Sequence, residues 1–152
     1  MRDFQVQDEH YEQRVRESFA RQKVMEFLSA EMTAVTPGGC EIQLPYHEGL
    51  SQQHGFFHGG IVGTIADSAA GYAGYSLMPP EASVLTVEYK MNMLAPADGD
   101  RLIARGEVVK AGRNLVITKA DVAVVKDQQA KPCATLLQTL MTVINRPDLS
   151  PG

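Results

Sequence analysis

Apolar and polar positions along His58–Leu77 follow a helical repeat, in a segment without proline that alanine and other helix-compatible residues fill. At about 100° per residue, one narrow stripe collects Thr64, Asp67, Ser68, Gly71 and Tyr75. The far side is formed by Val62, Ile65, Ala66, Ala69, Ala70 and Ala73. A helix so apolar and so rich in alanine and glycine is suited to close wrapping by another element, and we expect a sheet.

Pro79 and Pro80 end this helix. In the chain that follows, apolar and polar residues alternate with a period of two. Along Ser83–Leu94 the alternation predicts a strand with Val87, Tyr89, Met91 and Met93 on one face and Thr86, Glu88, Lys90 and Asn92 on the other. Three more β-rich runs follow: Arg101–Lys110, Asn114–Lys126 and Pro132–Ile144. Meandering strands after a helix predict an antiparallel sheet and therefore an α+β fold.

The N-terminal part adds a charged helical segment and a hairpin. Asp8–Phe27 has apolar residues at helical spacing among charged ones, which predicts an amphipathic helix that packs on the sheet. Ala30–Thr36 and Cys40–Pro45 read as two short strands around a Pro-Gly-Gly turn. We therefore predict one domain, with a helical segment at 1–28, the sheet and its helix at 29–146, and a loose tail at 147–152.

Composition excludes several classes of function. The chain has 152 residues, 44% hydrophobic and 21% charged, which is ordinary for a globular domain, and its net charge of −4 argues against a nucleic-acid binder. Cys40 and Cys133 are too few and too far apart for a disulfide framework or a zinc site, so we expect small buried hydrophobes and no metal. With neither a signal peptide nor a membrane-spanning run, we expect a cytoplasmic protein without a membrane partner.

A single carboxylate, Asp67, stands in the middle of the apolar helix. It marks a solvent-facing edge, or it is tied to Ser68, Thr64 and backbone groups, or it serves catalysis. The helix start at His58 offers unpaired N–H groups and a positive dipole end, which suit a carbonyl that gains negative charge.

Helical geometry separates these two groups within one chain. Asp67 follows His58 by nine residues, which is roughly 13 Å along the axis and about the opposite side of the helix. One helix therefore cannot aim its N-terminus and Asp67 at the same carbonyl carbon, whereas two antiparallel helices can. A catalytic role for Asp67 predicts a site shared across a two-fold dimer.

Two motifs carry a family resemblance: HGGIVGTIADSAAGYA, with Asp67 nine residues after His58, and the downstream strand with the pattern K-x-N-x-L-x-P-A. Together they resemble the hotdog-fold acyl-CoA thioesterases, in particular the phenylacetic-acid-degradation (PaaI-like) type, over most of the chain from about Glu48 to Val143. The resemblance implies a hotdog fold, in which an antiparallel sheet wraps a central helix, and this agrees with the α+β layout above. It also implies a homodimer, with dimers paired into a tetramer.

The resemblance implies a hydrolytic site. The backbone N–H of Gly59 would hold the thioester carbonyl oxygen, and Asp67 of the partner chain would act as general base on water or as nucleophile through a mixed anhydride. His58 would orient the loop rather than carry a proton. Gln52 stands where the family often has an asparagine, on a longer side chain, and Thr86 stands where it often has a serine or threonine.

Two residues, Thr86 and His54, have more than one interpretation. Thr86 could be a β-former on a strand rather than a residue that positions water. His54 could be a general base because of its near-neutral pKa, although a loop histidine beside glycine is often a turn or cap residue.

The resemblance implies acyl-CoA as the substrate, with no separate cofactor. The candidates for holding the CoA nucleotide are Lys90, Asn92, Lys110, Gly112 and Arg113, although basic turn residues are often only solvated. A pocket for a medium-chain or aryl acyl group is suggested by the seven methionines and four aromatic residues: Phe56, Phe57, Tyr72 and Tyr75. A non-catalytic acyl-CoA-binding protein remains an alternative that would not need Asp67, as does a hotdog hydratase or dehydratase, whose Asp-x-Asn-x-x-His or His-Phe-Pro signatures are not found here.

Overall fold

The computed structural model describes residues 3–146, so the predicted tail at 147–152 lies outside the described residues. Two N-terminal helices precede the first hairpin, and one long helix separates that hairpin from the remaining strands. In chain order the elements are α1 (Tyr11–Ala20), α2 (Lys23–Leu28), β1 (Glu31–Thr36), β2 (Gly39–Pro45), the 3-10 turn η1 (Glu48–Leu50), α3 (Gly59–Tyr75), β3 (Ala82–Met93), β4 (Arg101–Ala111), β5 (Leu115–Lys126) and β6 (Gln129–Ile144).

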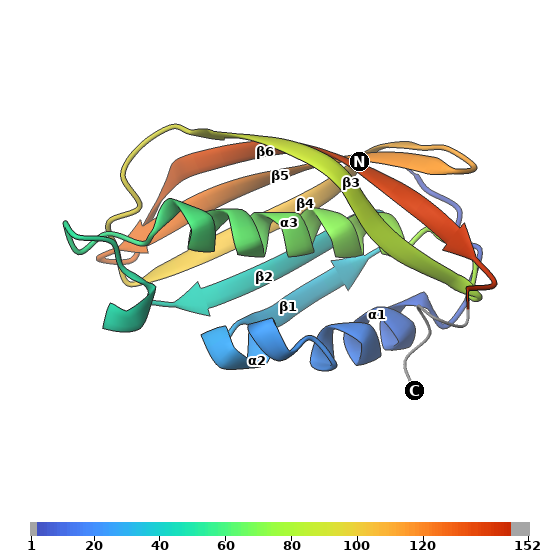
Figure 1. The fold of residues 1–152 in the computed structure, drawn as a ribbon, viewed down its shortest axis with the longest axis horizontal. Helices are drawn as coiled ribbons and strands as arrows, with labels where there is room; N and C mark the ends of the chain where they lie inside the picture. Colours follow the sequence, from blue (N-terminus) through green and yellow to red (C-terminus); the bar gives the residue numbers. More distant parts are fainter. Residues whose placement is uncertain (1–2, 147–152) are drawn as a thin grey trace.

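The strands form one antiparallel sheet in the order β1-β2-β4-β5-β6-β3, and the sheet curves around α3 (Figure 1). The predicted α+β architecture, with an antiparallel sheet around a central helix, is therefore confirmed. The predicted strands are confirmed as well, with ends that move by one to three residues; the largest change is at β6, which begins at Gln129 instead of Pro132.

Small residues let α3 approach the sheet closely. Val62, Ile65, Ala66, Ala69 and Ala70 have no exposed surface. A Cβ atom placed on Gly106 of β4 would lie 2.2 Å from the backbone oxygen of Ala69 on α3, which is far too close for two non-bonded atoms. The glycine and the alanine-rich helix face therefore set the distance between helix and sheet, as the composition of the segment predicts.

The N-terminal segment forms two helices, not the single helix predicted over Asp8–Phe27, because the backbone leaves the helical conformation at Gln22. Both helices lie beside β1 (Figure 1), and α1 and Gln22 reach α3 through side chains. Phe19 packs edge-on against Tyr72 with ring centroids 5.9 Å apart, and the Ser68 hydroxyl lies 3.5 Å from the Gln22 side-chain oxygen. Ser68 and Tyr75, predicted to share the stripe of Asp67, are consequently buried.

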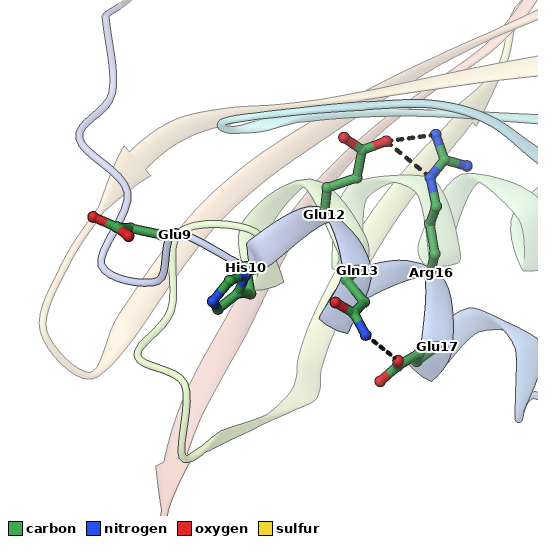
Figure 2. A pocket seen from close by; sticks show the side chains of 6 residues that line it. All are labelled: Glu9, His10, Glu12, Gln13, Arg16 and Glu17. Atoms are coloured by element: carbon green, nitrogen blue, oxygen red, sulfur yellow. Dashed lines mark hydrogen bonds and ion pairs between the residues drawn. The ribbon is translucent and has the colours of Figure 1, made fainter.

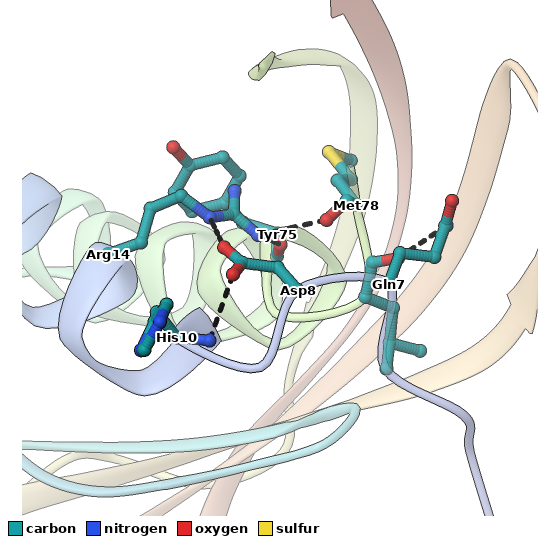
Figure 3. A network of polar contacts seen from close by, with 7 residues as sticks. Gln7, Asp8, His10, Arg14, Tyr75 and Met78 are labelled. Atoms are coloured by element: carbon teal, nitrogen blue, oxygen red, sulfur yellow. Dashed lines mark hydrogen bonds and ion pairs between the residues drawn. The ribbon is translucent and has the colours of Figure 1, made fainter. Parts of the chain in front are cut away.

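A polar anchor fixes α1 to the C-terminal end of α3 (Figure 3). The Arg14 guanidinium donates to Asp8 at 2.7 Å and to the carbonyl of Met78 at 2.9 Å, and it lies 4.3 Å from the centre of the Tyr75 ring. Gln7 donates to the carbonyl of Leu77 at 2.8 Å. A cation and an amide thus satisfy carbonyl groups at a helix C-terminus, where positive charge is favourable.

A β-bulge in β3 changes which side chains face α3. The register with β6 shifts between Thr86 and Glu88, so one extra residue is inserted and the alternation changes phase. Thr86 therefore faces α3 together with Met91, and the predicted placement of Thr86 on the face opposite Met91 is wrong. A simple period of two cannot anticipate a bulge, because the pairing partner on β6 determines it.

We predict that Asp8→Asn destabilises the fold at neutral pH by about 1 kcal/mol, because the neutral amide weakens the bond to Arg14. The His10 backbone N–H and the Arg14 guanidinium lower the pKa of the Asp8 carboxyl below its ordinary value of 3.8, although burial opposes the shift. A lowered pKa stabilises the fold above the unfolded pKa, and this contribution is lost as the pH falls through the folded pKa. Denaturant titrations should therefore show the difference between Asp8→Asn and wild type shrinking below about pH 4; a constant difference would contradict this account.

Candidate active site

The N-terminus of α3 is capped by His58, whose backbone is extended (φ −62°, ψ 137°). Its Nδ1 accepts a hydrogen bond from the Gly60 N–H at 2.8 Å, and its carbonyl accepts from Ile61 and Val62. Its own N–H donates to the carbonyl of Leu50 at 2.9 Å, which ties the preceding loop to the helix start. These bonds make His58 the side-chain cap of α3.

Gly59 presents the one early α3 amide that the cap leaves available. Its N–H has no acceptor among residues 3–146, whereas the next amide, that of Gly60, is occupied by His58. A Cβ atom on Gly59 would meet no other atom within 4 Å. The tip of α3 therefore combines an unpaired donor, the positive end of the helix dipole and space for a ligand or a second chain.

Asp67, in the middle of α3, is half-buried and held by two side chains from neighbouring strands. Thr86 on β3 donates from its hydroxyl to Asp67 Oδ1 at 2.9 Å, and Gln138 on β6 donates from its amide to the same oxygen. The carboxylate does not bond to Ser68 or Thr64; the Thr64 hydroxyl donates instead to the carbonyl of Gly60 at 2.8 Å. The interpretation that neighbours on the helix satisfy Asp67 is therefore wrong.

Both hydrogen bonds fall on Oδ1, which leaves the other carboxylate oxygen available. No donor to Asp67 Oδ2 lies in the described part of the chain. A half-buried carboxylate with one fixed oxygen and one free oxygen can accept a proton from water or attack a carbonyl carbon.

The sequence interpretation missed Gln138 and its partner Thr118 on β5. Their exposed fractions are 1% and 0%, and the Thr118 hydroxyl donates to Gln138 Oε1 at 3.1 Å. The sequence did contain a signal: on β6 the inward-facing positions 136 and 140 are leucine, and Gln138 is a polar residue at the inward-facing position between them. A polar residue at an inward strand position needs a partner.

Gln52, the candidate site residue at the position where the family often has an asparagine, is engaged in its own turn. Its side-chain oxygen accepts from the His54 N–H, its backbone N–H donates to Phe56 at 2.9 Å, and its carbonyl accepts from Gly55 at 3.0 Å. His54 is exposed, with its ring centroid 6.4 Å from that of Phe56. In a single chain, neither residue is hydrogen-bonded to Asp67.

The candidate CoA residues do not meet the tip of α3 within one chain. Lys110, Gly112 and Arg113 lie at the β4–β5 turn, at the opposite end of α3 from Gly59 (Figure 1). Lys90 and Asn92 are exposed on β3, and they flank Met91, whose methyl group faces α3 at Gly63. They therefore point to the other face of the sheet.

The apolar side chains beside Asp67 differ from those that the sequence suggested. Tyr72, Tyr75 and Phe57, which the sequence suggested for an acyl pocket, have exposed fractions of at most 8% and belong to the core. The side chains of Tyr89 and Met91 instead lie beside α3 at Gly63, one turn before Asp67.

Two other regions belong to the scaffold rather than to the site. Six polar residues of the N-terminal segment line a shallow hollow on α1: Glu9, His10, Glu12, Gln13, Arg16 and Glu17 (Figure 2). Two contacts join successive turns of α1 across this surface: the ion pair between Arg16 and Glu12 at 2.9 Å, and the hydrogen bond from the Gln13 side-chain amide to Glu17. Cys40 and Cys133 are free and buried, as expected, and burial raises the pKa of the Cys40 thiol to about 12.

Comparison with known proteins agrees with this geometry. The sequence profile of the Thioesterase superfamily matches residues 54–133, which is more than half of the chain and includes both the α3 tip and Asp67. The chain belongs to the thioesterase superfamily, and the predicted resemblance to hotdog-fold thioesterases is confirmed.

Individual relatives support the same assignment. A thioesterase family protein from Silicibacter pomeroyi is 50% identical, with a TM-score of 0.88 over 89% of this chain and 99% of that one. The 1,4-dihydroxy-2-naphthoyl-CoA hydrolase of Listeria monocytogenes is 26% identical over 60% of this chain and 74% of that protein. The PaaI protein of the E. coli phenylacetic acid degradation operon shares the fold, with a TM-score of 0.79 at 19% identity over 91% of this chain and 96% of that one. Within residues 3–146, no helix is long and apolar enough to cross a membrane.

We predict that His58→Ala lowers the free energy of unfolding by about 1 kcal/mol, because it removes the side-chain cap of α3. His58→Asn should restore most of this loss, because asparagine is also a good N-cap acceptor. Chemical denaturation of the three proteins measures the difference. Equal stability of wild type and His58→Ala would show that Nδ1 contributes nothing to the helix start.

Proposed function

We propose that this protein is an acyl-CoA thioesterase that hydrolyses medium-chain or aryl acyl-CoA to the free acid and CoA. The observation that carries the proposal is the Asp67 carboxylate, held by its Oδ1 and free at Oδ2, in a chain whose helix tip offers an unpaired amide at Gly59. A carboxylate base and an amide donor are what thioester hydrolysis requires, because a thiolate leaves without a strong general acid.

The proposed reaction proceeds through a tetrahedral intermediate. Asp67 Oδ2 takes a proton from water as the water oxygen bonds to the thioester carbon, and the Gly59 N–H stabilises the negative charge on the former carbonyl oxygen. The C–S bond then breaks, the acid is released, and the CoA thiolate takes up the proton. In the alternative route, Oδ2 attacks the carbon directly and the C–S bond breaks to release the CoA thiolate. Water then hydrolyses the mixed anhydride to the free acid and the Asp67 carboxylate, and the proton from water passes to the thiolate.

The proposed site requires a second chain, and β3 is the strand that would recruit it. β3 pairs with β6 on one edge only, and no strand among residues 3–146 pairs with its other edge. Val87 and Tyr89 on this strand are 55% and 47% exposed. A long apolar edge strand is a template for pairing with another chain.

Pairing of two β3 edges about a two-fold axis would extend the sheet and set the two α3 helices antiparallel. Thr86, which bonds Asp67, lies on β3, so the carboxylate would face the new interface. The Gly59 amide of one protomer would then approach Asp67 of the other. The same pairing would bring the β4–β5 turn of one chain toward the α3 tip of its partner, which supports a role for Lys110 and Arg113 in CoA phosphate binding.

The other face of the sheet supports the proposed pairing of dimers into a tetramer. Leu115, Met141 and Leu85 are register neighbours on β5, β6 and β3, and they are 46%, 43% and 46% exposed. They form an apolar row across three strands on the side away from α3. An exposed apolar surface of this kind is suited to self-association.

The main test of the proposal is Asp67→Asn. We expect turnover of acyl-CoA to fall by about 10²–10⁴-fold, because the amide cannot accept the proton from water. The panel should include short, medium, long and phenylacetyl thioesters, with released thiol as the readout and Thr64→Ser as the matched control on the same helix side. Turnover by Asp67→Asn near that of wild type, across the panel, would refute the assignment.

The shared site is tested by mixed dimers. Gly59→Val should block the helix tip, so neither Asp67→Asn nor Gly59→Val homodimers should hydrolyse acyl-CoA. After the two variants are unfolded and refolded together, half of the dimers are mixed and each has one complete site. We therefore expect about a quarter of the wild-type activity to return. If no activity returns although mixed dimers are demonstrated by mass spectrometry, the two groups act within one chain or not at all.

A further inference from the structure

Gln138 is a buried polar side chain on the sheet face that packs against α3. It is 1% exposed, and its inward neighbours on β6 are the buried apolar residues Leu136 and Leu140. A buried amide without partners would cost stability, and an apolar residue would fill the position more favourably. Stability alone therefore does not explain a glutamine here, and its hydrogen bonds indicate the reason.

The partners of Gln138 fix the orientation of its amide group. The NH2 group of Gln138 faces Asp67 and donates to its Oδ1. The amide oxygen then faces Thr118, whose hydroxyl donates at 3.1 Å and is fully buried. The result is a directed chain of hydrogen bonds from Thr118 through Gln138 to Asp67.

Gln138 and Thr86 reach the carboxylate from different surroundings. Thr86 lies exposed beside the bulge of β3, the edge strand, whereas Gln138 lies on β6 between two paired strands. The Gln138 amide also lies 3.4 Å from the Asp67 backbone oxygen and 3.4 Å from the Thr86 hydroxyl. Gln138 is thus the donor whose position the interior of the domain determines.

We propose that Gln138, oriented by Thr118, is the positioning residue that holds Asp67 Oδ1 so that Oδ2 faces the thioester. This inference rests on the proposed function, because it assigns Gln138 a role only through the catalytic carboxylate. It predicts that loss of the amide lets the carboxylate rotate and reduces the rate of the chemical step, while substrate binding is unaffected.

The test is Gln138→Met, which keeps the approximate length of the side chain and removes both the amide oxygen and the NH2 group. Because a hydrogen bond to a charged group contributes about 1.5–3 kcal/mol, we expect kcat to fall about 10- to 100-fold with KM within about twofold of wild type. Thr118→Val should lower kcat in the same direction, and Thr118→Ser, which keeps the hydroxyl, should restore most of it. Leu136→Met is the control for a packing change at the neighbouring inward position of β6.

The outcomes separate this inference from the proposed function. Loss of kcat in Gln138→Met and Thr118→Val, with recovery in Thr118→Ser and little change in Leu136→Met, supports the positioning role. Wild-type kcat in Gln138→Met, or a rise in KM that accounts for the whole effect, overturns it while Asp67→Asn remains inactive. If Gln138→Met does not fold, the Thr118→Val and Thr118→Ser pair decides by the same kcat criterion. Full activity of Asp67→Asn is the different result that would refute the catalytic role of the carboxylate itself.

Discussion

The close packing of α3 against the curved sheet is the constraint on which the site depends. Alanine on the helix and Gly106 on β4 allow backbone-to-backbone approach, and no larger residue fits at that glycine without displacing the helix. This proximity is what allows Gln138, at the middle of β6, to reach a carboxylate on α3. A helix held further from the sheet would leave Asp67 without its buried donor. The short distance between helix and sheet therefore accounts both for the close packing of the core and for the hydrogen bond to Asp67.

The strands and the central helix could be predicted from the sequence because each depends on local patterns. Alternation, turn residues and the two prolines after α3 place most element ends within one or two residues. The position of Thr86 could not be predicted in the same way, since the bulge beside it arises from pairing with β6. The break after α1 was also missed, because an amphipathic pattern continues through Gln22 although the backbone turns there.

The site shows the same division between local and long-range information. Asp67 and the His58 cap belong to one contiguous motif, so they stand out in the sequence. Gln138 is 71 positions away from Asp67, and its identity as a partner follows only from the fold. The aromatic residues mislead for a related reason: Tyr72 and Tyr75 lie on the same helix as Asp67, but side chains of α1 pack on them and they belong to the core.

In the proposed dimer each chain contributes the Gly59 amide to one site and Asp67 to the other, which is consistent with candidate residues that lie apart within a single chain. The most direct measurement of the central claim is a crystal structure of the protein with a non-hydrolysable acyl-CoA thioether or ketone analogue. Our account predicts the analogue's carbonyl oxygen about 3 Å from the Gly59 N–H of one protomer, with Asp67 of the other protomer beside the carbonyl carbon. An analogue bound away from Gly59, or one contacted by both groups of the same chain, would contradict the account.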